Sequence, residues 1–186
     1  MFKEYIESKK EEMINNLQKL ISIPSIYEKS DIPSTPFGKN VNDALNFMLD
    51  LGKEMGFRTK NIDGYCGYIE FGEGEELIGI IGHLDVVPVD DGWTYPPFSA
   101  TIFDNKIYGR GAIDDKGPVI ASLYAMKSIL DTCKIHKRVR LILGLNEENS
   151  WKCIEYYKSH EESPTIGFSP DADFPCIYAE KAILSS

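Results

Sequence analysis

The sequence has few of the features that direct a chain to a membrane, a secretory route or a nucleic acid. No apolar run approaches the length of a bilayer span, and residues 1–13 are charged throughout, without the apolar core of a signal peptide. Basic residues are in deficit, with 20 Lys and Arg against 29 Asp and Glu and a net charge of −9. Because nucleic acids and anionic membranes both require basic surface, we expect neither as a partner, and we expect a cytoplasmic protein.

Cysteine is sparse, and its spacing is uninformative for metal binding or cross-linking. The four cysteines, Cys66, Cys133, Cys153 and Cys176, form no pair at short spacing. We therefore expect reduced thiols rather than a disulfide framework or a zinc knuckle.

Three common ligand-binding or catalytic patterns are also missing. The sequence contains no Gly-x-x-x-x-Gly-Lys-Ser/Thr phosphate loop and no Gly-x-Ser-x-Gly elbow. The glycine-rich segment that starts at Gly109 places Asp114 where a dinucleotide-binding loop has its last glycine. A carboxylate at that position would repel a pyrophosphate, so these classes are set aside.

The sequence predicts alternating helices and strands, in a number that suits one globular domain. It has 186 residues, of which 42% are apolar and 26% charged, enough for one sizeable core. Periodicity predicts helices at residues 3–21, 41–55, from about 118, and 150–159, with strands at 57–63, 66–72, 77–82, 138–145 and 165–169. A hairpin is expected around Asp104-Asn105. The alternation predicts an α/β fold with a largely parallel central sheet.

Acidic and imidazole side chains follow three of these strands. The strand-end segments are His83-Leu84-Asp85, Asn146-Glu147-Glu148 and Asp171-Ala172-Asp173, and the pair Asp114-Asp115 precedes the helix near Pro118. Ligands of open α/β sheets bind at the carboxyl ends of the strands. So many carboxylates at one edge would repel one another without a cation, and mixed nitrogen and oxygen donors suit zinc, with cobalt or manganese as substitutes. The pattern predicts a metal site.

Each cluster alone has a simpler interpretation. The acids at 114–115 and 147–148 precede helices, where carboxylates commonly cap the first turn. Asp171 and Asp173 alone would form an ordinary turn, and a lone histidine after a buried strand is more often structural than a ligand. The clusters together favour a metal site, while an α/β protein whose acids are merely solvated caps stays as an alternative.

In order along the chain, the segments GHLDVVP, GW…PF, YGRGAIDDKGP, NEENSW and FSPDADFP closely resemble the zinc-dependent dipeptidases of the aminoacylase and carboxypeptidase-G superfamily. Relatives there include carnosinases and succinyl-diaminopimelate desuccinylases, and the last segment is typical of the bacterial broad-specificity dipeptidases. The resemblance covers essentially the whole chain. It implies a three-layer α/β/α, zinc-exopeptidase-like fold with a mixed sheet, in which residues 1–186 are the amino-terminal portion of the catalytic metal-binding domain.

The resemblance also implies a two-metal site. His83 and Asp171 would hold one ion, Glu148 would hold the other, and Asp114 would bridge the two. The family's second ion takes its last histidine from a carboxyl-terminal segment, and we expect both that segment and the family's lid domain to be absent here. Two zinc ions are therefore expected in a complete site and one well-formed zinc site in this chain. The peptide bond between Asp114 and Asp115 is expected to be cis.

Two further residues take catalytic roles by the same resemblance. Asp85 would hydrogen-bond the far nitrogen of His83 and so fix its tautomer. Glu147 would be the general base that takes a proton from water and passes it to the leaving amine, in the hydrolysis of small peptides.

The chain departs from the family pattern in several places. Ala179 and Ala182 replace two usual glycines, and neither His136 nor His160 stands in the context of the family's last ligand. Two hypotheses follow: a metallodipeptidase, or a catalytically inactive fragment that folds and binds about one metal ion. Missing strands and lid would leave apolar surface uncovered, so self-association is expected.

Overall fold

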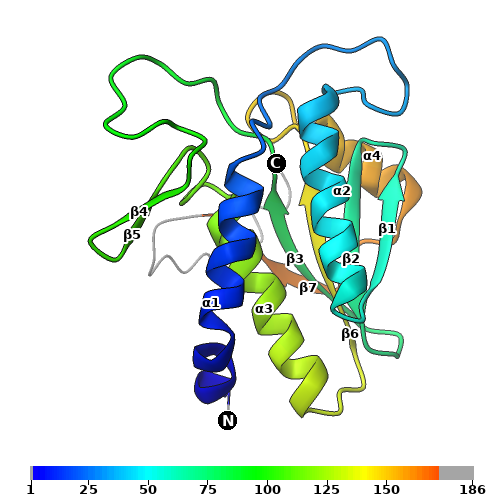
Figure 1. Ribbon diagram of the computed structural model, residues 1–186. Coiled ribbons are helices and arrows are strands. Elements are labelled where there is room, and N and C mark those ends of the chain that lie inside the picture. Colours follow the sequence, from blue (N-terminus) through cyan, green and yellow to red (C-terminus); the bar gives the residue numbers. More distant parts are fainter. Residues whose placement is uncertain (1, 172–186) are drawn as a thin grey trace.

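A five-stranded mixed sheet with helices on both faces forms the body of the molecule (Figure 1). The computed structural model describes residues 2–171. The helices are α1 Phe2–Ile21, α2 Lys39–Glu54, α3 Lys116–Thr132 and α4 Lys152–His160. The sheet contains β1 Arg58–Ile62, β2 Cys66–Phe71, β3 Leu77–His83, β6 Arg138–Gly144 and β7 Ile166–Phe168. A separate hairpin consists of β4 Thr101–Phe103 and β5 Lys106–Tyr108.

The strand order β1-β2-β6-β3-β7 divides the sheet into an antiparallel and a parallel part. β1 pairs with β2 and β2 with β6 in antiparallel fashion. β3 lies between β6 and β7 and is parallel to both. Consequently β6, β3 and β7 end at the same edge of the sheet, which places the segments that follow them side by side. The predicted α/β class is confirmed, with antiparallel pairings confined to the β1 side.

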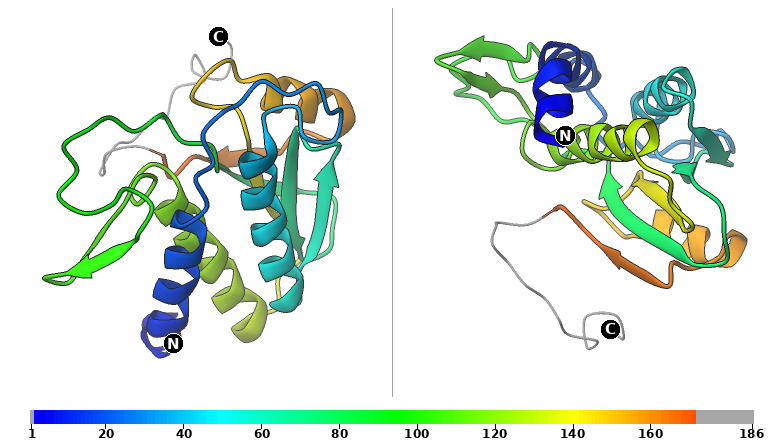
Figure 2. Two further views of the ribbon diagram at one scale, coloured as in Figure 1. Left: turned by 45° about the horizontal axis from the view of Figure 1, so that its top comes forward. Right: turned by 90° about the horizontal axis from the view of Figure 1, so that it is seen from below.

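The helices form two layers around this sheet (Figure 2). α2 packs on β1 and β2, and α3 packs on β3 and β6, while α1 lies against α3. α4 covers the opposite face, where it contacts β2. The three-layer α/β/α arrangement that the resemblance implied is therefore the observed one.

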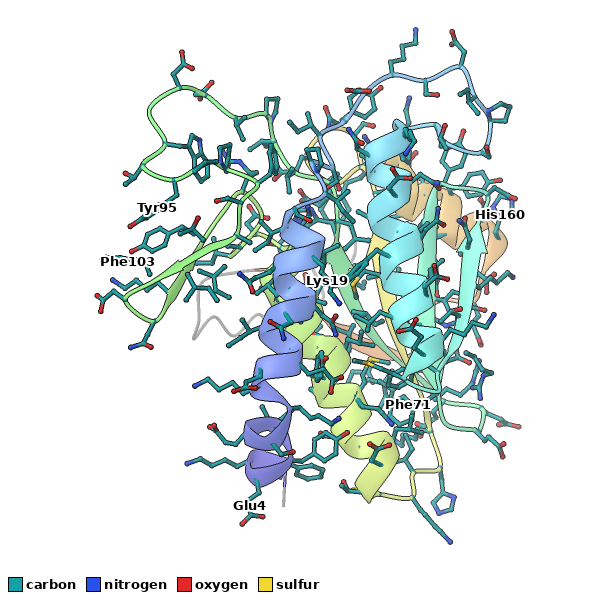
Figure 3. The ribbon with its side chains drawn as sticks, in the orientation of Figure 1. Glu4, Lys19, Phe71, Tyr95, Phe103 and His160 are labelled. Carbon is teal, nitrogen blue, oxygen red and sulfur yellow. The ribbon has the colours of Figure 1, made fainter. Side chains whose placement is uncertain are left out.

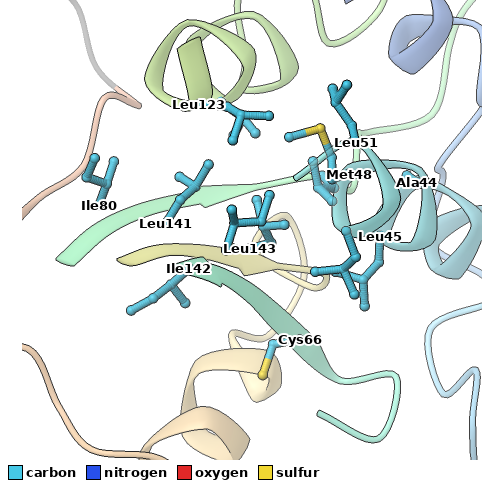
Figure 4. Close-up of a cluster of buried hydrophobic side chains, with 14 of the residues drawn as sticks. Ala44, Leu45, Met48, Leu51, Cys66, Ile80, Leu123, Leu141, Ile142 and Leu143 are labelled. Carbon is cyan, nitrogen blue, oxygen red and sulfur yellow. The ribbon is translucent and has the colours of Figure 1, made fainter. Parts of the chain in front are cut away.

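The central strands β3 and β6 are largely buried, and apart from Arg138 and Arg140 they carry apolar residues or glycine up to their last positions, as is typical of strands covered on both faces. Figure 4 shows the core between the sheet and the helices, where side chains of α2 and α3 meet those of β3 and β6. Fully or almost fully buried members of this core include Ala44, Leu45, Met48, Leu123, Leu141 and Leu143. Because β3 and β6 are packed between helices on both faces, this packing fixes the positions of the residues at their ends.

The boundaries of the helices and strands agree with the sequence-based expectations to within about two residues, and the start of the third helix is instructive. The third helix begins at Lys116, two residues before the expected start near Pro118. Proline is tolerated there because the first N–H groups of a helix have no intrahelical acceptor.

The hairpin expected around Asp104-Asn105 is confirmed. Both residues have positive φ, 50° and 57°, as a two-residue turn that follows the strand twist requires. Tyr95 packs against Phe103, with ring centroids 6.2 Å apart, on this projecting hairpin (Figure 3). Within residues 2–171 no helix combines the length and apolar character needed to cross a bilayer.

Candidate metal centre

His83 ends β3 with its imidazole facing several carboxylates, although the residue is only 2% exposed. Its Nε2 lies 2.9 Å from Asp114 Oδ1, 3.5 Å from Asp171 Oδ2 and 4.0 Å from Glu147 Oε2. These carboxylates come from three places: the loop before α3, the segment after β7 and the segment after β6. In the β3–β6 ladder His83 pairs with Gly144, the last residue of β6, which brings Glu147 to the same edge. The structure thus brings together the residues that the strand-end pattern singled out.

Two sets of donor atoms at this edge lie close enough to hold a cation. One is His83, Asp114 and Asp171, and the other is His83, Glu147 and Glu148, with the atoms of each set within 4.8 Å of one another. Imidazole nitrogen with carboxylate oxygens is a donor set that suits zinc and related divalent ions. The residues therefore fit a divalent cation, and His83 belongs to both sets.

The electrostatics of the cluster favour a bound cation. Burial raises the pKa of Glu147, of Glu148 and of Asp171, and Asp114 raises each of them further. Each raised pKa means that gathering these negative charges costs free energy. A divalent cation at this edge would offset that cost.

Two opposing effects act on the pKa of His83. Burial alone would lower its pKa, but the carboxylates of Asp85, Asp115 and Asp171 outweigh burial and raise the pKa to about 10. An imidazole must be neutral to bind a metal ion, so a cation at Nε2 would displace a proton.

Asp85 contacts His83 differently from the sequence-based expectation. His83 Nδ1 lies 2.9 Å from the backbone carbonyl oxygen of Asp85, whereas the nearest carboxylate oxygen is 3.5 Å away. The fully buried carboxylate instead accepts two backbone N–H groups, of Glu147 at Oδ1 and of Glu148 at Oδ2, both at 3.1 Å. The expected hydrogen bond to the far nitrogen is therefore made by the main chain of Asp85, because its side chain is occupied by the segment after β6.

Asp115 has a structural role at this edge that the sequence did not indicate. Its Oδ2 accepts the backbone N–H of His83 at 3.1 Å, and the residue is fully buried. Burial raises its pKa to about 7. A side chain at Gly82 would come within 2.6 Å of Asp115 Oδ2, so glycine is required for this close approach. The peptide bond between Asp114 and Asp115 is cis, as expected.

The capping interpretation of the acidic pairs is wrong. Asp115 occupies the N-cap position of α3, but its side chain makes no capping hydrogen bond. The N-cap of α4 is Trp151, which leaves Glu147 and Glu148 outside the first turn of that helix. The acids at both places face the cluster around His83 instead.

A small cavity of about 20 Å³ adjoins the cluster. His83, Glu147 and Asp171 line it together with Trp151 and Cys153. Its volume suffices for about one water molecule. Trp151, the last residue of the NEENSW segment, is 50% exposed and has a φ of 57°; its side chain was not expected to line this edge.

The other two histidines lie away from this cluster and belong to neither donor set. His136 precedes β6 and lines an open groove with Phe71 and Leu130, near the opposite end of β6 from Glu147. His160 ends α4 (Figure 3). Its ring stacks on that of Tyr156, with the centroids 4.0 Å apart. Asp173, the second acid of the last strand-end segment, lies outside the described residues, as do Cys176, Ala179 and Ala182.

Comparison with known proteins decides the family. The model of "Peptidase family M20/M25/M40" matches residues 79–185 of this 186-residue chain, a range that contains every residue of the cluster. The chain belongs to this peptidase family. A protein of Bacillus subtilis (strain 168) named "Putative dipeptidase YtjP" is 51% identical over 180 residues, which are 96% of this chain and 39% of that protein. The chain thus spans well under half the length of this M20 relative.

Solved structures of M20 proteins share the fold. The M20 family metallo-carboxypeptidase Sso-CP2 from Sulfolobus solfataricus superimposes with a TM-score of 0.69 at 27% identity, covering 87% of this chain and 37% of that one. Human carnosine dipeptidase 1 gives a TM-score of 0.67 at 24% identity, with 84% of this chain and 37% of that chain covered. In both, the similarity extends over most of this chain.

Proposed function

We propose that this chain supplies the metal-binding part of a dipeptidase, which hydrolyses the peptide bond of small unblocked peptides. The observation that carries the proposal is the convergence of Asp114, Asp171 and Glu147 on His83 Nε2, at 2.9, 3.5 and 4.0 Å. The name of the 51% identical B. subtilis relative supports dipeptides as the substrate class.

The proposed metal ligands are those that the family resemblance implies, and the proximity of His83, Asp114 and Asp171 supports them. His83, Asp114 and Asp171 would hold one ion, and Asp114 with Glu148 would contribute to a second, with Asp114 shared between them. Zinc is proposed, with cobalt or manganese as substitutes, because the donors are one imidazole nitrogen and several carboxylate oxygens. Such ions, when bound, polarise a carbonyl oxygen and make water more acidic.

Glu147 is proposed as the general base. Its side chain is 25% exposed, and burial raises its pKa, so its Oε2 atom is suited to accept a proton and release it again. Water adds to the peptide carbonyl carbon while Glu147 takes its proton. The proton then passes to the amine nitrogen as the C–N bond breaks, giving a carboxylic acid and an amine.

Asp85 is proposed to orient both partners of this reaction. Its carbonyl fixes His83 Nδ1, and its carboxylate fixes the backbone of Glu147 and Glu148. A ligand and the general base therefore keep a constant relative position.

A second candidate function is a non-catalytic chain that folds and binds about one metal ion. The observation in its favour is that, among residues 2–171, both donor sets depend on the same histidine. One imidazole nitrogen cannot serve two separate ions, so the described residues complete one metal site rather than two.

Hydrolysis of a panel of unblocked dipeptides separates the two functions. The metal-free chain is assayed with added Zn²⁺, Co²⁺ or Mn²⁺, beside Glu147→Gln and a control, Glu155→Gln, on the exposed side of α4. The dipeptidase proposal predicts turnover that falls by about 10²–10⁴ in Glu147→Gln and is unchanged in the control. No turnover by a chain that still binds one ion would favour the non-catalytic function.

A further inference from the structure

Lys116, the first residue of α3, is fully buried, which is rare for lysine. Its Nζ donates hydrogen bonds to the backbone carbonyls of Leu20, at 3.0 Å, and of Ile23, at 2.7 Å. Leu20 lies in the last turn of α1 and Ile23 lies just beyond it. Carbonyl groups at the end of a helix lack intrahelical donors and attract positive charge, so the ammonium group is well placed there. Lys116 thereby joins the start of α3 to the end of α1.

The chain around Lys116 is folded closely onto its side chain. Gly111 has a φ of 83°, and a side chain at this position would come within 3.0 Å of Lys116 Cδ. Val86 Cγ1 lies equally close to the same point. A side chain at Gly117 would come within 2.1 Å of the carbonyl oxygen of Ala112. The loop that carries Asp114 is therefore compact and is built around the lysine stem.

Lys116 lies two residues after Asp114 and therefore next to the candidate metal centre in the sequence. Asp114 contacts His83 Nε2, although its own side chain is 57% exposed. The next residue, Asp115, is held on β3 by the backbone N–H of His83. The residue after that, Lys116, is held on α1. Two consecutive anchors on different elements therefore fix the direction in which Asp114 leaves the main chain.

We propose that Lys116 is a positioning residue for the metal centre: it ties the loop carrying Asp114 to the end of α1 and keeps Asp114 at the distance from His83 that a divalent cation requires. The inference rests on the metal-binding part of the proposed function. It further implies that the carboxyl end of α1, which contributes no donor atom to either set, is energetically coupled to the site.

The test measures Co²⁺ binding by its visible absorption, which does not depend on catalysis. Lys116→Met keeps most of the apolar part of the side chain and removes the ammonium group with its hydrogen bonds to Leu20 and Ile23. The control is Asn16→Ala, which removes a buried hydrogen bond from α1 to Tyr124 of α3 without touching the loop. We expect both variants to lower the Tm, but only Lys116→Met to weaken Co²⁺ binding, by about tenfold or more. An unchanged Kd in folded Lys116→Met would overturn the inference.

Hydrogen exchange of the unaltered chain provides a second test, which also decides the case if Lys116→Met does not fold. Coupling between two sites is reciprocal, so Zn²⁺ should slow amide exchange at residues 20–23 as well as at 83–85 and 114–117. Protection confined to the latter two segments would contradict the coupling. If the unaltered chain binds neither Co²⁺ nor Zn²⁺, the proposed metal site itself is wrong and the inference falls with it.

Discussion

The carboxylate of Asp85 accepts the backbone N–H of Glu147 at 3.1 Å, so the residue two positions after His83 holds the segment that follows β6. The neighbouring N–H of Glu148 binds the other oxygen of the same carboxylate. One buried side chain therefore connects the ends of two adjacent parallel strands. This connection explains why an acid two residues after His83 is compatible with complete burial: two backbone N–H groups hydrogen-bond its carboxylate oxygens.

Replacing Asp85 with asparagine tests this connection. The amide group of Asp85→Asn would place an NH₂ donor against a backbone N–H donor, leaving a buried group unsatisfied. We expect a loss of about 1–3 kcal/mol in the free energy of unfolding, measured by urea denaturation. The control Asp104→Asn, in the exposed β4–β5 turn, should change stability by less than about 0.5 kcal/mol. Equal effects of the two substitutions would show that the buried carboxylate is unimportant.

A buried ion pair on the α4 face provides a second prediction. Arg140 Nε donates to Glu70 Oε2 at 2.7 Å, and the two residues are 3% and 6% exposed. Glu70→Gln should destabilise the fold by about 3 kcal/mol, because the guanidinium stays buried after its main partner is neutralised. Thermal and urea unfolding beside the exposed control Glu75→Gln would measure this difference. A change no larger than the control's would mean that Glu161 and Glu162, which also approach Arg140, replace the lost charge.

Thiol reactivity should distinguish the cysteines by burial. Cys66 and Cys153 are fully buried, and burial raises the pKa of Cys66 to about 12 and raises that of Cys153. In a Cys176→Ser background, DTNB should modify Cys133, which is partly exposed, and leave the other two unmodified. Raising the pH from about 7 to about 9 should not change this, since Cys66 stays protonated well below its pKa. Rapid modification of all three remaining thiols in the folded Cys176→Ser variant would contradict the burial of Cys66 and Cys153.

Self-association is expected at the β7 edge of the sheet. β7 pairs with β3 on one side, and the side chains of Ile166 and Phe168 are 66% and 55% exposed. An apolar edge strand of this kind favours pairing with another chain. Light scattering should show a mass that rises with protein concentration and falls in the double variant Ile166→Lys, Phe168→Lys. A monomer at all concentrations would rule this surface out as an association site.

Much of the fold was predictable because local sequence and tertiary environment agree. The run that became β3 is apolar or glycine up to His83, and β6 is apolar or glycine except for Arg138 and Arg140, as is typical of strands buried on both faces. The turn at Asp104-Asn105 carries residues that tolerate positive φ. The start of α3 at Lys116 was missed because proline was taken as the first helical residue. The antiparallel pairing of β2 with β6 was not predictable from periodicity, since pairing direction depends on contacts between distant segments.

The candidate site was predictable only in part. The strand-end pattern marked the clusters that contain His83, Asp114, Glu147 and Asp171, and the resemblance to the zinc-dependent dipeptidases selected these residues within the clusters. The two hydrogen-bond partners of the Asp85 carboxylate could not be predicted, because they are backbone N–H groups, which almost every residue carries. Lys116 was missed for a similar reason: its acceptors are main-chain carbonyls 93 and 96 positions away.

We propose that the edge where β3, β6 and β7 end holds a divalent cation. Calorimetric titration of the metal-stripped chain with Zn²⁺ tests it most directly, beside His83→Ala and the control His160→Ala. We expect saturable binding of about one ion per chain, which is lost in His83→Ala and retained in His160→Ala. At a free Zn²⁺ concentration of 100 times the Kd, this binding should stabilise the fold by about 2.7 kcal/mol. Absence of binding, or equal binding by His83→Ala, would contradict it.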